Sequence, residues 1–356
     1  MTAGGTKPAG RFPIPGQEHL KVLIVTDAWR PQVNGVVTTL EMLGRELRAL
    51  GHEVCYATPQ GRFTVPLPTY PEIRLAIFPR QGLEKLFREF APDAVHIATE
   101  GTMGLSARAI CLKHGIEFTT AFHTRFPEYI HARFPFVSES IVWRFERWFH
   151  RDAIATMART PTLKRELESQ GLRHVRLWEG GVDVDHFRPI ADAALAFQRP
   201  IFLYVGRVAI EKNIEAFLSL DLPGTKVVVG PGPARESLQR KYPSAKFLGP
   251  QSGEELVRTY SASDVNVFPS LTDTFGLVML EALACGTPVA TFPHEVMKDV
   301  VGSCPAAALD DDLGAACRRA LTLSRSEARA FALTRSARAS TLQFLGNLVV
   351  EQPQEG

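Results

Sequence analysis

The sequence predicts an α/β protein built from two doubly wound domains, and three observations lead to this expectation. The chain has 356 residues, which is enough for two domains of ordinary size. A buried strand, a helix and a second strand follow one another at 21–57, and the same alternation starts again at 200. Hydrophobic residues make up 45% of the chain and charged residues 22%, which is typical of a soluble globular protein.

Composition and charge exclude several other classes of protein. The formal net charge of +2 does not favour a nucleic-acid binder. The five cysteines are scattered with no C-x-x-C pair, which indicates a reducing compartment and argues against a disulfide scaffold or a metal cluster. No apolar run reaches the ~18 residues that a membrane helix needs. Residues 1–18 are rich in Gly and Pro without an apolar core, so we expect a disordered tail rather than a signal peptide.

The first domain begins with a parallel strand at 21–26, a continuous run of apolar and β-branched residues. Apolar residues then recur at helical spacing over 36–50, and a second strand follows at 52–57. The loop between strand and helix lies where open α/β sheets bind ligands. It lacks the G-x-G-x-x-G pattern of a dinucleotide site. Gly35 in this loop either lets the backbone approach a ligand or is only a turn residue.

The same alternation continues to about residue 190. We expect one strand at 73–78 within a proline-rich stretch, further strands at 94–98, 118–122, 153–157 and 175–178, and helices at 105–114, 139–151 and 161–169. His123 comes directly after the strand at 118–122, at the strand end where α/β sites lie. A lone histidine is more often structural than functional, so both interpretations stay open from the residues alone.

The helix expected at 139–151 mixes aromatic side chains with basic ones. Trp143, Phe145, Trp148 and Phe149 lie among arginines and a histidine. Such a helix can form an interfacial surface, with basic heads above aromatic bodies. The alternative is that the aromatic side chains pack in the core. Because large apolar side chains are costly to expose, we favour the core slightly.

The second domain restarts with a strand at 200–205, and the loop that follows it carries two cations. Gly206 ends the strand and allows a close backbone approach. Arg207 offers a planar fork for phosphate oxygens, and Lys212 offers a point charge. Two cations on one loop would offset the charge of a diphosphate. Without further information, a solvated basic loop is the favoured alternative.

Strands at 226–229, 246–249 and 265–268 and a helix at 254–262 complete this alternation, and after 300 we expect mostly helix. The stretch 269–288 then joins a strand end, a polar turn and a helix at 277–284. Thr272, Asp273 and Thr274 in its turn are good N-cap residues. A helix start offers free N–H groups and the positive end of a dipole, which suits phosphate.

Glu281 lies about two turns into this helix and points near the same face as Asp273. One carboxylate would therefore stand at the mouth of the helix start and another deeper, with bare amides between them. That arrangement can hold a sugar and a ribose on either side of a phosphate pair. The alternative is ordinary: every α/β domain contains a strand, turn and helix, and a helical glutamate is usually solvated.

The stretch Pro-Ser-x-x-Asp-x-Phe-Gly-Leu-x-x-x-Glu-Ala-x-Ala-x-Gly-x-Pro-Val, at 269–289, resembles the donor-site signature of retaining family-4 glycosyltransferases of the GT-B fold. Members have Glu where this chain has Asp273. Gly-Arg-x-x-x-Glu-Lys-Asn at 206–213 resembles the family's diphosphate clamp, and the loop that ends in Gly35 resembles its glycine-bearing loop. His-Thr-x-x-Pro-x-Tyr, from His123, resembles a motif of transferases that glycosylate membrane lipids. The resemblance spans about 21–301, in the family's order.

The resemblance implies two Rossmann-like domains facing a cleft, and a hexosyl transfer from a nucleotide sugar to a hydroxyl group. It also implies retention of configuration, with no metal and no cofactor beyond the donor itself. The implied roles are ribose binding by Glu281, neutralisation of the diphosphate by Arg207 and Lys212, contacts to phosphate or sugar from the amides of Phe275, Gly276 and Leu277, sugar binding by Asp273, approach to the sugar by His123, and close passage of the donor by Gly35 and Gly206.

We expect a tail at 1–18, an acceptor-side domain at 19–190, a nucleotide-sugar domain at 191–335 and a helix at 336–356 that crosses back to the first domain. A UDP-sugar is the favoured donor and a membrane lipid such as diacylglycerol the favoured acceptor. The alternatives are a GDP-mannose-dependent α-mannosyltransferase and a non-catalytic nucleotide-sugar-binding module. We expect a cytoplasmic protein with peripheral contact to the inner membrane leaflet and no nucleic-acid partner.

Overall fold

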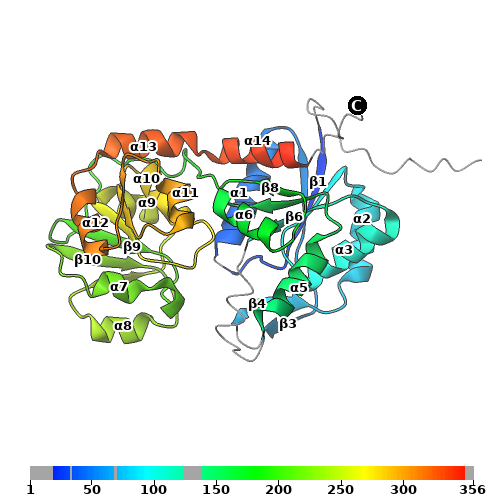
Figure 1. Ribbon diagram of the computed structural model, residues 1–356, viewed down its shortest axis with the longest axis horizontal. Coiled ribbons are helices and arrows are strands. Elements are labelled where there is room, and N and C mark those ends of the chain that lie inside the picture. Colours follow the sequence, from blue (N-terminus) through cyan, green and yellow to red (C-terminus); the bar gives the residue numbers. More distant parts are fainter. Residues whose placement is uncertain (1–18, 33, 68–69, 124–137, 349–356) are drawn as a thin grey trace, which may run out of the picture. The chain divides into compact units, whose positions relative to one another are not determined.

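The structure is a computed structural model that describes residues 19–32, 34–67, 70–123 and 138–348 (Figure 1). The chain forms two compact units. The first unit contains the residues up to Glu179 together with those from Ser340 on, and the second unit is Gly180–Ala339. The sequence analysis placed the corresponding boundaries at 190 and 335. Within the described residues, no helix is both long enough and apolar enough to span a bilayer.

The first unit is built on a six-stranded parallel sheet in the order β2-β1-β5-β6-β7-β8. Its strands are β1 (Lys21–Val25), β2 (Glu53–Ala57), β5 (Ala94–Ile97), β6 (Thr119–Phe122), β7 (Ala155–Ala158) and β8 (Val175–Leu177). Its helices before β8 are α1 (Gly35–Ala49), α2 (Arg80–Phe90), α3 (Thr102–His114), α5 (Glu139–His150) and α6 (Pro161–Ser169). Every residue of β5, β6 and β7 is buried, because helices cover both faces of a parallel sheet.

One expectation for this unit was wrong. The proline-rich stretch contains an antiparallel pair, β3 (Thr64–Leu67) and β4 (Tyr70–Ala76), rather than one strand at 73–78. Val65 pairs with Leu75 and Pro66 with Arg74. The short β3 was missed because its proline has no N–H to donate to a ladder, so the sequence weakens the strand pattern.

The second unit repeats the design with a sheet in the order β11-β10-β9-β12-β13-β14, all parallel. Its strands are β9 (Ile201–Val205), β10 (Thr225–Val229), β11 (Lys246–Gly249), β12 (Val265–Phe268), β13 (Val289–Thr291) and β14 (Ala307–Leu309). Numbered along the chain, this is the doubly wound order 3-2-1-4-5-6, so the strand order reverses between β9 and β12. Ligands of such sheets bind at that reversal.

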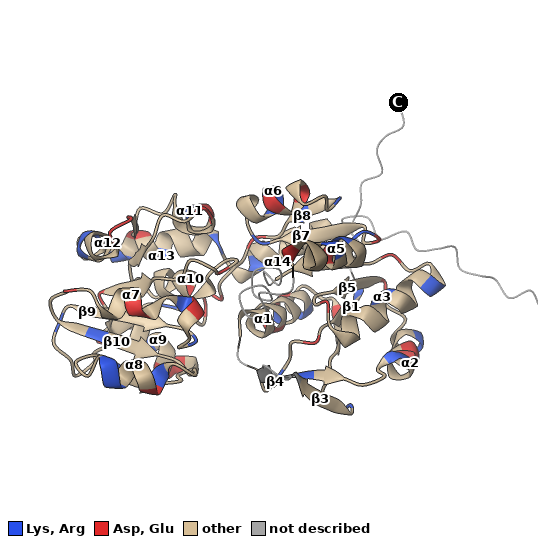
Figure 2. Cartoon of the chain, turned by 60° about the horizontal axis from the view of Figure 1, so that its bottom comes forward, with Lys and Arg blue, Asp and Glu red and all other residues tan. Residues whose placement is uncertain are grey.

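Helices cover both faces of the second sheet (Figure 1). One apolar core includes residues of α9 (Gly253–Ala262), α10 (Leu277–Ala284), α11 (Glu295–Val301) and α13 (Arg325–Thr334). The other includes residues of α7 (Ile214–Leu218), α8 (Arg235–Lys241) and α12 (Leu313–Ala320). Charged residues belong mainly to helices and loops, and the strands contain few of them (Figure 2). The expectation of mostly helix after 300 missed β14, whose three residues are too few to show a strand pattern.

The last helix, α14 (Ala337–Asn347), completes the core of the first unit. Phe344 and Leu348 are 0% and 1% exposed and pack in one cluster with Trp178. The indole Nε1 of Trp178 donates to Ser340 Oγ at 3.1 Å, and Asn347 Nδ2 donates to the carbonyl of Leu177 at 2.8 Å. Residues at the end of the described chain therefore complete the apolar core beside the sheet whose strand β1 begins at Lys21.

Candidate active site

The predicted clamp and the predicted donor signature lie on the two loops at the strand reversal of the second unit. The loop after β9 carries the clamp residues and the loop after β12 carries Asp273, and β9 and β12 are hydrogen-bonded neighbours. Thr272 Oγ1 donates to the carbonyl of Glu211 at 3.1 Å, and Asn213 Nδ2 donates to the carbonyl of Pro269 at 3.1 Å. The structure therefore holds two segments, 60 residues apart in sequence, against each other at the ligand-binding edge of the sheet.

Lys212 and Asp273 form an ion pair across these loops. The distance from Lys212 Nζ to Asp273 Oδ1 is 2.6 Å, and the two side chains are 20% and 22% exposed. From the sequence we expected separate roles for these residues, Lys212 toward the diphosphate and Asp273 toward the sugar, and the contact between them was not predicted. The pair places a cation and an anion side by side at the reversal point.

Glycine is required where the loop after β9 meets the loop after β10. Gly206 has φ +148° and its N–H donates to the carbonyl of Val229 at 3.0 Å. Gly230 has φ +137°, and a Cβ there would stand 1.9 Å from the carbonyl oxygen of Gly206. The hydroxyl of Tyr204 donates to the carbonyl of Arg207 at 2.9 Å. Backbone packed on backbone therefore sets the path of the loop that carries Arg207.

The start of α10 differs from the prediction in one respect. Thr272, Asp273 and Thr274 were expected to cap the helix, but the N-cap residue is Gly276, in the left-handed region with φ +83° and ψ +59°. Glycine adopts this conformation without steric cost and has no side chain with which to cap. The expectation failed because Asp273 binds Lys212 instead. The helix then begins at Leu277 and ends at Ala284, as predicted.

Phe275 is anchored rather than exposed. It is 5% exposed, and a Cβ built on Gly180 would lie 2.1 Å from its ring carbon Cε1. Any side chain at position 180 would therefore displace the ring. The absence of a side chain at Gly180 lets Phe275 fix the turn that leads into α10.

Glu281 faces inward, toward α9. Its Oε2 accepts a hydrogen bond from the hydroxyl of Tyr260 at 2.9 Å. Burial raises the pKa of the Glu281 carboxyl to about 7, and the hydrogen bond from Tyr260 only partly offsets this effect. Burial and the neighbouring carboxylate also raise the pKa of the Tyr260 hydroxyl well above its usual value. Burial therefore favours the protonated form of the Glu281 carboxyl more than it is favoured in an exposed glutamate.

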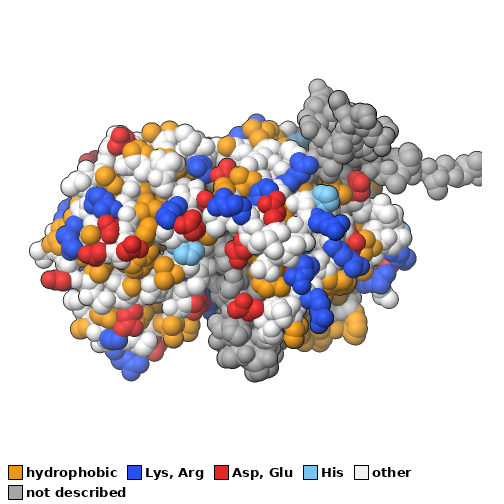
Figure 3. Space-filling model, in the orientation of Figure 1, with side chains coloured by type: hydrophobic (Ala, Val, Ile, Leu, Met, Phe, Trp, Pro, Cys, Tyr) orange, Lys and Arg blue, Asp and Glu red, His pale blue; other side chains and the backbone are white. Residues whose placement is uncertain are grey.

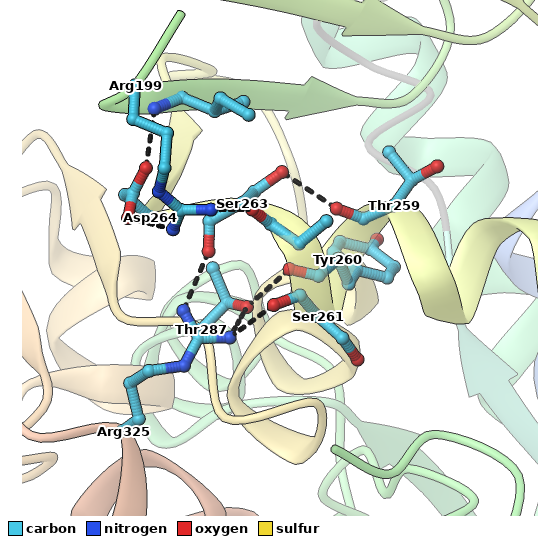
Figure 4. Close-up of polar contacts among 10 residues, drawn as sticks. Arg199, Thr259, Tyr260, Ser261, Ser263, Asp264, Thr287 and Arg325 are labelled. Atoms are coloured by element: carbon cyan, nitrogen blue, oxygen red, sulfur yellow. Dashed lines mark hydrogen bonds and ion pairs between the residues drawn. The ribbon is translucent and has the colours of Figure 1, made fainter. Parts of the chain in front are cut away.

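A network of polar contacts holds the C-terminal end of α9, on which Tyr260 lies (Figure 4). Arg325 donates to the carbonyls of Ser263 and Ser261 at 2.7 and 2.6 Å. Thr287 Oγ1 donates to the carbonyl of Tyr260 at 2.6 Å. Cations and donors at a helix C-terminus satisfy carbonyls that have no partner within the helix. The network thereby fixes the position of the hydroxyl that binds Glu281.

The raised pKa of Glu281 predicts how the free energy of unfolding changes with pH. A carboxyl whose pKa rises from 4.5 to about 7 on folding stabilises the folded state below the unfolded pKa, and this contribution is lost as the pH rises through 7. We expect the free energy of unfolding of the wild type to fall, relative to Glu281→Gln, by about 3 kcal/mol between pH 4.5 and pH 8. Urea unfolding at several pH values measures this difference, and parallel pH profiles for the two proteins would contradict it.

In the first unit the structure locates Gly35 and His123, the two predicted residues outside the second unit. Gly35 is the first residue of α1, and Asn34 caps that helix by accepting hydrogen bonds from the N–H groups of Val36 and Val37 at 3.1 and 3.0 Å. His123 directly follows β6 and is half-buried. The remainder of its motif, at 124–129, lies outside the described residues.

His123 is held as a neutral imidazole. Burial, together with the positive charge of Arg159 and the neighbouring His96, lowers the pKa of His123 well below 6.5. Its ring also meets the edge of Trp178, with the two ring centroids 5.7 Å apart. A neutral imidazole can donate one hydrogen bond and accept another, but it brings no charge to the strand end at which it lies.

Sequence reasoning missed two sets of polar residues in the first unit. Asp27, after β1, is 5% exposed and accepts hydrogen bonds from the N–H groups of Met103 and Gly104 at the start of α3, at 2.9 and 3.3 Å. Nothing local in the sequence predicts this capping, since the partners lie more than 70 residues away. The second set is a buried cluster of Glu100, Glu146 and His150. Its one sequence signal was the i, i+4 spacing of Glu146 and His150 within an aromatic helix.

Comparison with known proteins identifies the family. Residues 33–186 match the model of Glycosyltransferase Family 4, and residues 199–323 match that of Glycosyl transferases group 1. The GDP-mannose-dependent alpha-mannosyltransferase of Mycobacterium tuberculosis is 30% identical over 295 residues, which cover 76% of this chain and 78% of the relative. The sulfoquinovosyl transferase SQD2 of Arabidopsis thaliana is 28% identical over 76% of this chain, which spans 58% of that longer relative. The alpha-monoglucosyldiacylglycerol synthase of Acholeplasma laidlawii is 26% identical over 76% of this chain and 79% of the relative.

Solved structures agree on the fold. Sucrose-phosphate synthase from Thermosynechococcus elongatus superposes with a TM-score of 0.74 at 22% identity, covering 91% of this chain and 97% of that one. HepE from Anabaena, solved in complex with UDP-glucose, superposes with a TM-score of 0.68 at 15% identity, covering 93% and 99%. These neighbours confirm the predicted GT-B fold, and retaining, metal-independent transfer is consistent with the family. The chain belongs to the family-4 glycosyltransferases, with a group 1 glycosyltransferase domain as its second half.

Proposed function

We propose that this glycosyltransferase moves a hexosyl group from a UDP-sugar to a hydroxyl group of a membrane lipid such as diacylglycerol. The observation that carries the lipid acceptor is one face of α5. Ile141, Phe145 and Trp148 are 54%, 37% and 40% exposed, and their i, i+4, i+7 spacing places them on a single helical face. The relative from Acholeplasma laidlawii, by its name, makes a glucosyl lipid.

This face has the composition of a membrane-binding surface. On the same helix, Val142, Trp143 and Phe149 are buried, so the core interpretation holds for Trp143 and Phe149 but was wrong for Phe145 and Trp148. Arg144 on the same helix and Arg151 at its C-terminal end are also exposed. Figure 3 shows several Lys and Arg side chains on the part of the first unit where α3 and α5 lie. Exposed apolar side chains on a surface that also carries basic ones suit an anionic lipid bilayer.

In the reaction we propose, the bond between the anomeric carbon and the diphosphate oxygen breaks, and a bond to the acceptor oxygen forms on the same face of the sugar. The proton of the acceptor hydroxyl passes to the leaving phosphate oxygen. Arg207 and Lys212 stabilise the negative charge that grows on the diphosphate. The N–H groups of Phe275, Gly276 and Leu277 contact phosphate or sugar oxygens, and Glu281 accepts hydrogen bonds from the ribose. His123 contacts the sugar as a neutral donor, and Gly35 and Gly206 allow the donor to pass close to the backbone.

The nucleotide is tested by thermal shift with UDP, GDP and ADP, followed by the matching sugar nucleotides. Ligand binding to the folded state stabilises it by mass action, by about 2.7 kcal/mol at a ligand concentration a hundred times Kd. The melting midpoint rises as a result. We expect a shift with UDP and none with GDP or ADP. The second candidate is GDP-mannose, favoured by the name of the Mycobacterium tuberculosis relative. A shift with GDP alone would replace the UDP-sugar proposal with the GDP-mannose proposal. If no nucleotide gave a shift, the proposal that this protein binds a nucleotide-sugar donor would be contradicted.

The lipid acceptor predicts vesicle binding through α5. We expect the wild type to float with vesicles that contain anionic lipid and diacylglycerol, and Ile141→Ser with Phe145→Ser to lower the floated fraction at least about tenfold, the effect of losing about 1.4 kcal/mol of apolar burial. Leu333→Ser is the matched control, because Leu333 is 50% exposed on α13 of the second unit. Equal flotation of the wild type, the double variant and the control, or no flotation of the wild type, would contradict the proposal that this face of α5 binds a lipid bilayer.

A further inference from the structure

The cluster of Glu100, Glu146 and His150 brings three metal-ligating side chains together inside the first unit. Glu100 lies in the loop between β5 and α3, whereas Glu146 and His150 lie one turn apart on α5. The Nε2 of His150 is 3.3 Å from Glu146 Oε2 and 3.5 Å from Glu100 Oε1. One ligand atom from each residue lies within 4.8 Å of the other two. None of these residues takes part in the transfer proposed above.

The cluster is buried, and its polar atoms are incompletely satisfied. Glu100, Glu146 and His150 are 9%, 1% and 2% exposed. Across the residues that the structure describes, both carboxylate oxygens of Glu146 and the Nε2 of His150 are buried and make no hydrogen bond of normal geometry beyond the close contacts within the cluster itself. Two buried carboxylates beside one imidazole leave an excess of negative charge if all three keep their usual forms. Buried groups of this kind are normally paired, hydrogen-bonded or bound to a metal ion.

A second contact holds the histidine ring in a ligating orientation. The Nδ1 of His150 lies 2.8 Å from Thr120 Oγ1, and that hydroxyl lies 3.1 Å from Thr156 Oγ1 on the next strand. One ring nitrogen is thereby engaged with the sheet, and the other faces the two carboxylates. Histidines that bind metal ions are held in this way, with one nitrogen on the metal and the other hydrogen-bonded to the protein.

The distances match the size of a small divalent cation. Tetrahedral zinc sites have bonds of about 2.0–2.1 Å to nitrogen and oxygen, which sets neighbouring ligand atoms about 3.3–3.4 Å apart. The separations of 3.3 and 3.5 Å around His150 Nε2 agree with that edge length. A set of one imidazole and two carboxylates suits Zn²⁺, whereas Mg²⁺ and Ca²⁺ prefer oxygen ligands alone.

We propose that Glu100, Glu146 and His150 bind one Zn²⁺ ion, which ties the loop before α3 to α5 and stabilises the first unit. We assign the site a structural role, because its three residues are buried and join two segments of the first unit. It binds Mg²⁺ much more weakly.

The full chain, treated with a chelator and dialysed against ZnCl₂, tests the proposal by its metal content. We expect about one Zn²⁺ per chain in the wild type, and a loss of at least about tenfold in Zn²⁺ affinity in Glu146→Gln. His114→Gln is the matched control, since His114 is exposed on α3 and its loss should leave binding unchanged. Absence of bound Zn²⁺ from the wild type, or equal binding by Glu146→Gln, would show instead that the three residues share protons as a buried ion cluster.

Two further measurements guard against a variant that fails to fold. Co²⁺ added to the wild type should give the intense visible absorption of a tetrahedral site, and a weak octahedral spectrum would contradict the geometry. Zn²⁺ at about a hundred times Kd should raise the melting midpoint of the wild type by about 5 °C or more, but not that of Glu100→Gln. An equal rise in both proteins would place the bound ion elsewhere.

Discussion

Arg207→Ala and Lys212→Ala are each expected to lower turnover at least about tenfold, the scale of one lost charge-assisted contact to a diphosphate. The structure places Lys212 on the loop after β9, where it meets Asp273 from the loop after β12. In the transfer that we propose, the leaving diphosphate gains negative charge, so an interaction with a cation strengthens as the reaction proceeds. Steady-state kinetics on the purified protein should show the loss in kcat rather than in KM alone.

The control for this prediction is Arg240→Ala, which removes an exposed arginine of α8 whose Nε donates to the carbonyl of Glu236 in the same helix. A double-mutant cycle with Asp273→Asn adds a test of the ion pair. Because Lys212→Ala also leaves Asp273 without this partner, the two substitutions should be non-additive. Near-normal turnover in both single clamp variants would contradict the assignment of the clamp.

Gly230→Ala is expected to destabilise the second unit by at least about 3 kcal/mol, and so to lower its melting midpoint by about 6 °C or more. Two effects combine. The backbone at Gly230 has φ +137°, which residues with a Cβ rarely adopt, and the new Cβ would lie 1.9 Å from the carbonyl oxygen of Gly206. The clash is with backbone, so no side-chain rotation relieves it. Thermal unfolding followed by circular dichroism measures the shift.

The matched control is Gly346→Ala on α14. Among the described residues, no atom outside the adjacent residues and backbone of α14 lies within 4 Å of the Cβ that this substitution would add, and the φ of Gly346 is not left-handed. Alanine favours a helix over glycine by about 0.5–1 kcal/mol, so this variant should be as stable as the wild type or more so. If Gly230→Ala were as stable as Gly346→Ala, the close contact between Gly206 and Gly230 would not be what sets the path of the loop after β9.

The sequence predicted well those features that depend on local pattern. The runs that became β1 and β9 are continuous and apolar, and the helix at 277–284 has the bounds that its helix formers and Gly286 indicated. The order of elements also restricts how an α/β sheet can be wound, which is why two doubly wound domains could be predicted. The exact strand order, and with it the contact between the loops after β9 and β12, comes from the structure.

Contacts between side chains that lie far apart in the sequence could not be predicted in this way. Asp273 was expected at the helix cap and instead pairs with Lys212, a residue on another loop. Glu281 was expected to be directed at a ligand, and its inward hydrogen bond to Tyr260 depends on how α9 packs beside α10. A short polar side chain in a turn has several competing acceptors and donors, and only tertiary packing decides among them.

The docking of α14 has a consequence for the order in which the protein is made. Phe344 and Leu348 complete the core of the first unit, yet the ribosome adds them only after the whole of Gly180–Ala339. Domains of a growing chain generally fold from the N-terminus onward as they are synthesised. Here the continuous second unit is finished first, while the nascent first unit keeps the apolar side of Trp178 uncovered until translation has passed Leu348. We therefore expect the half that begins the chain to be the half that depends more on chaperones.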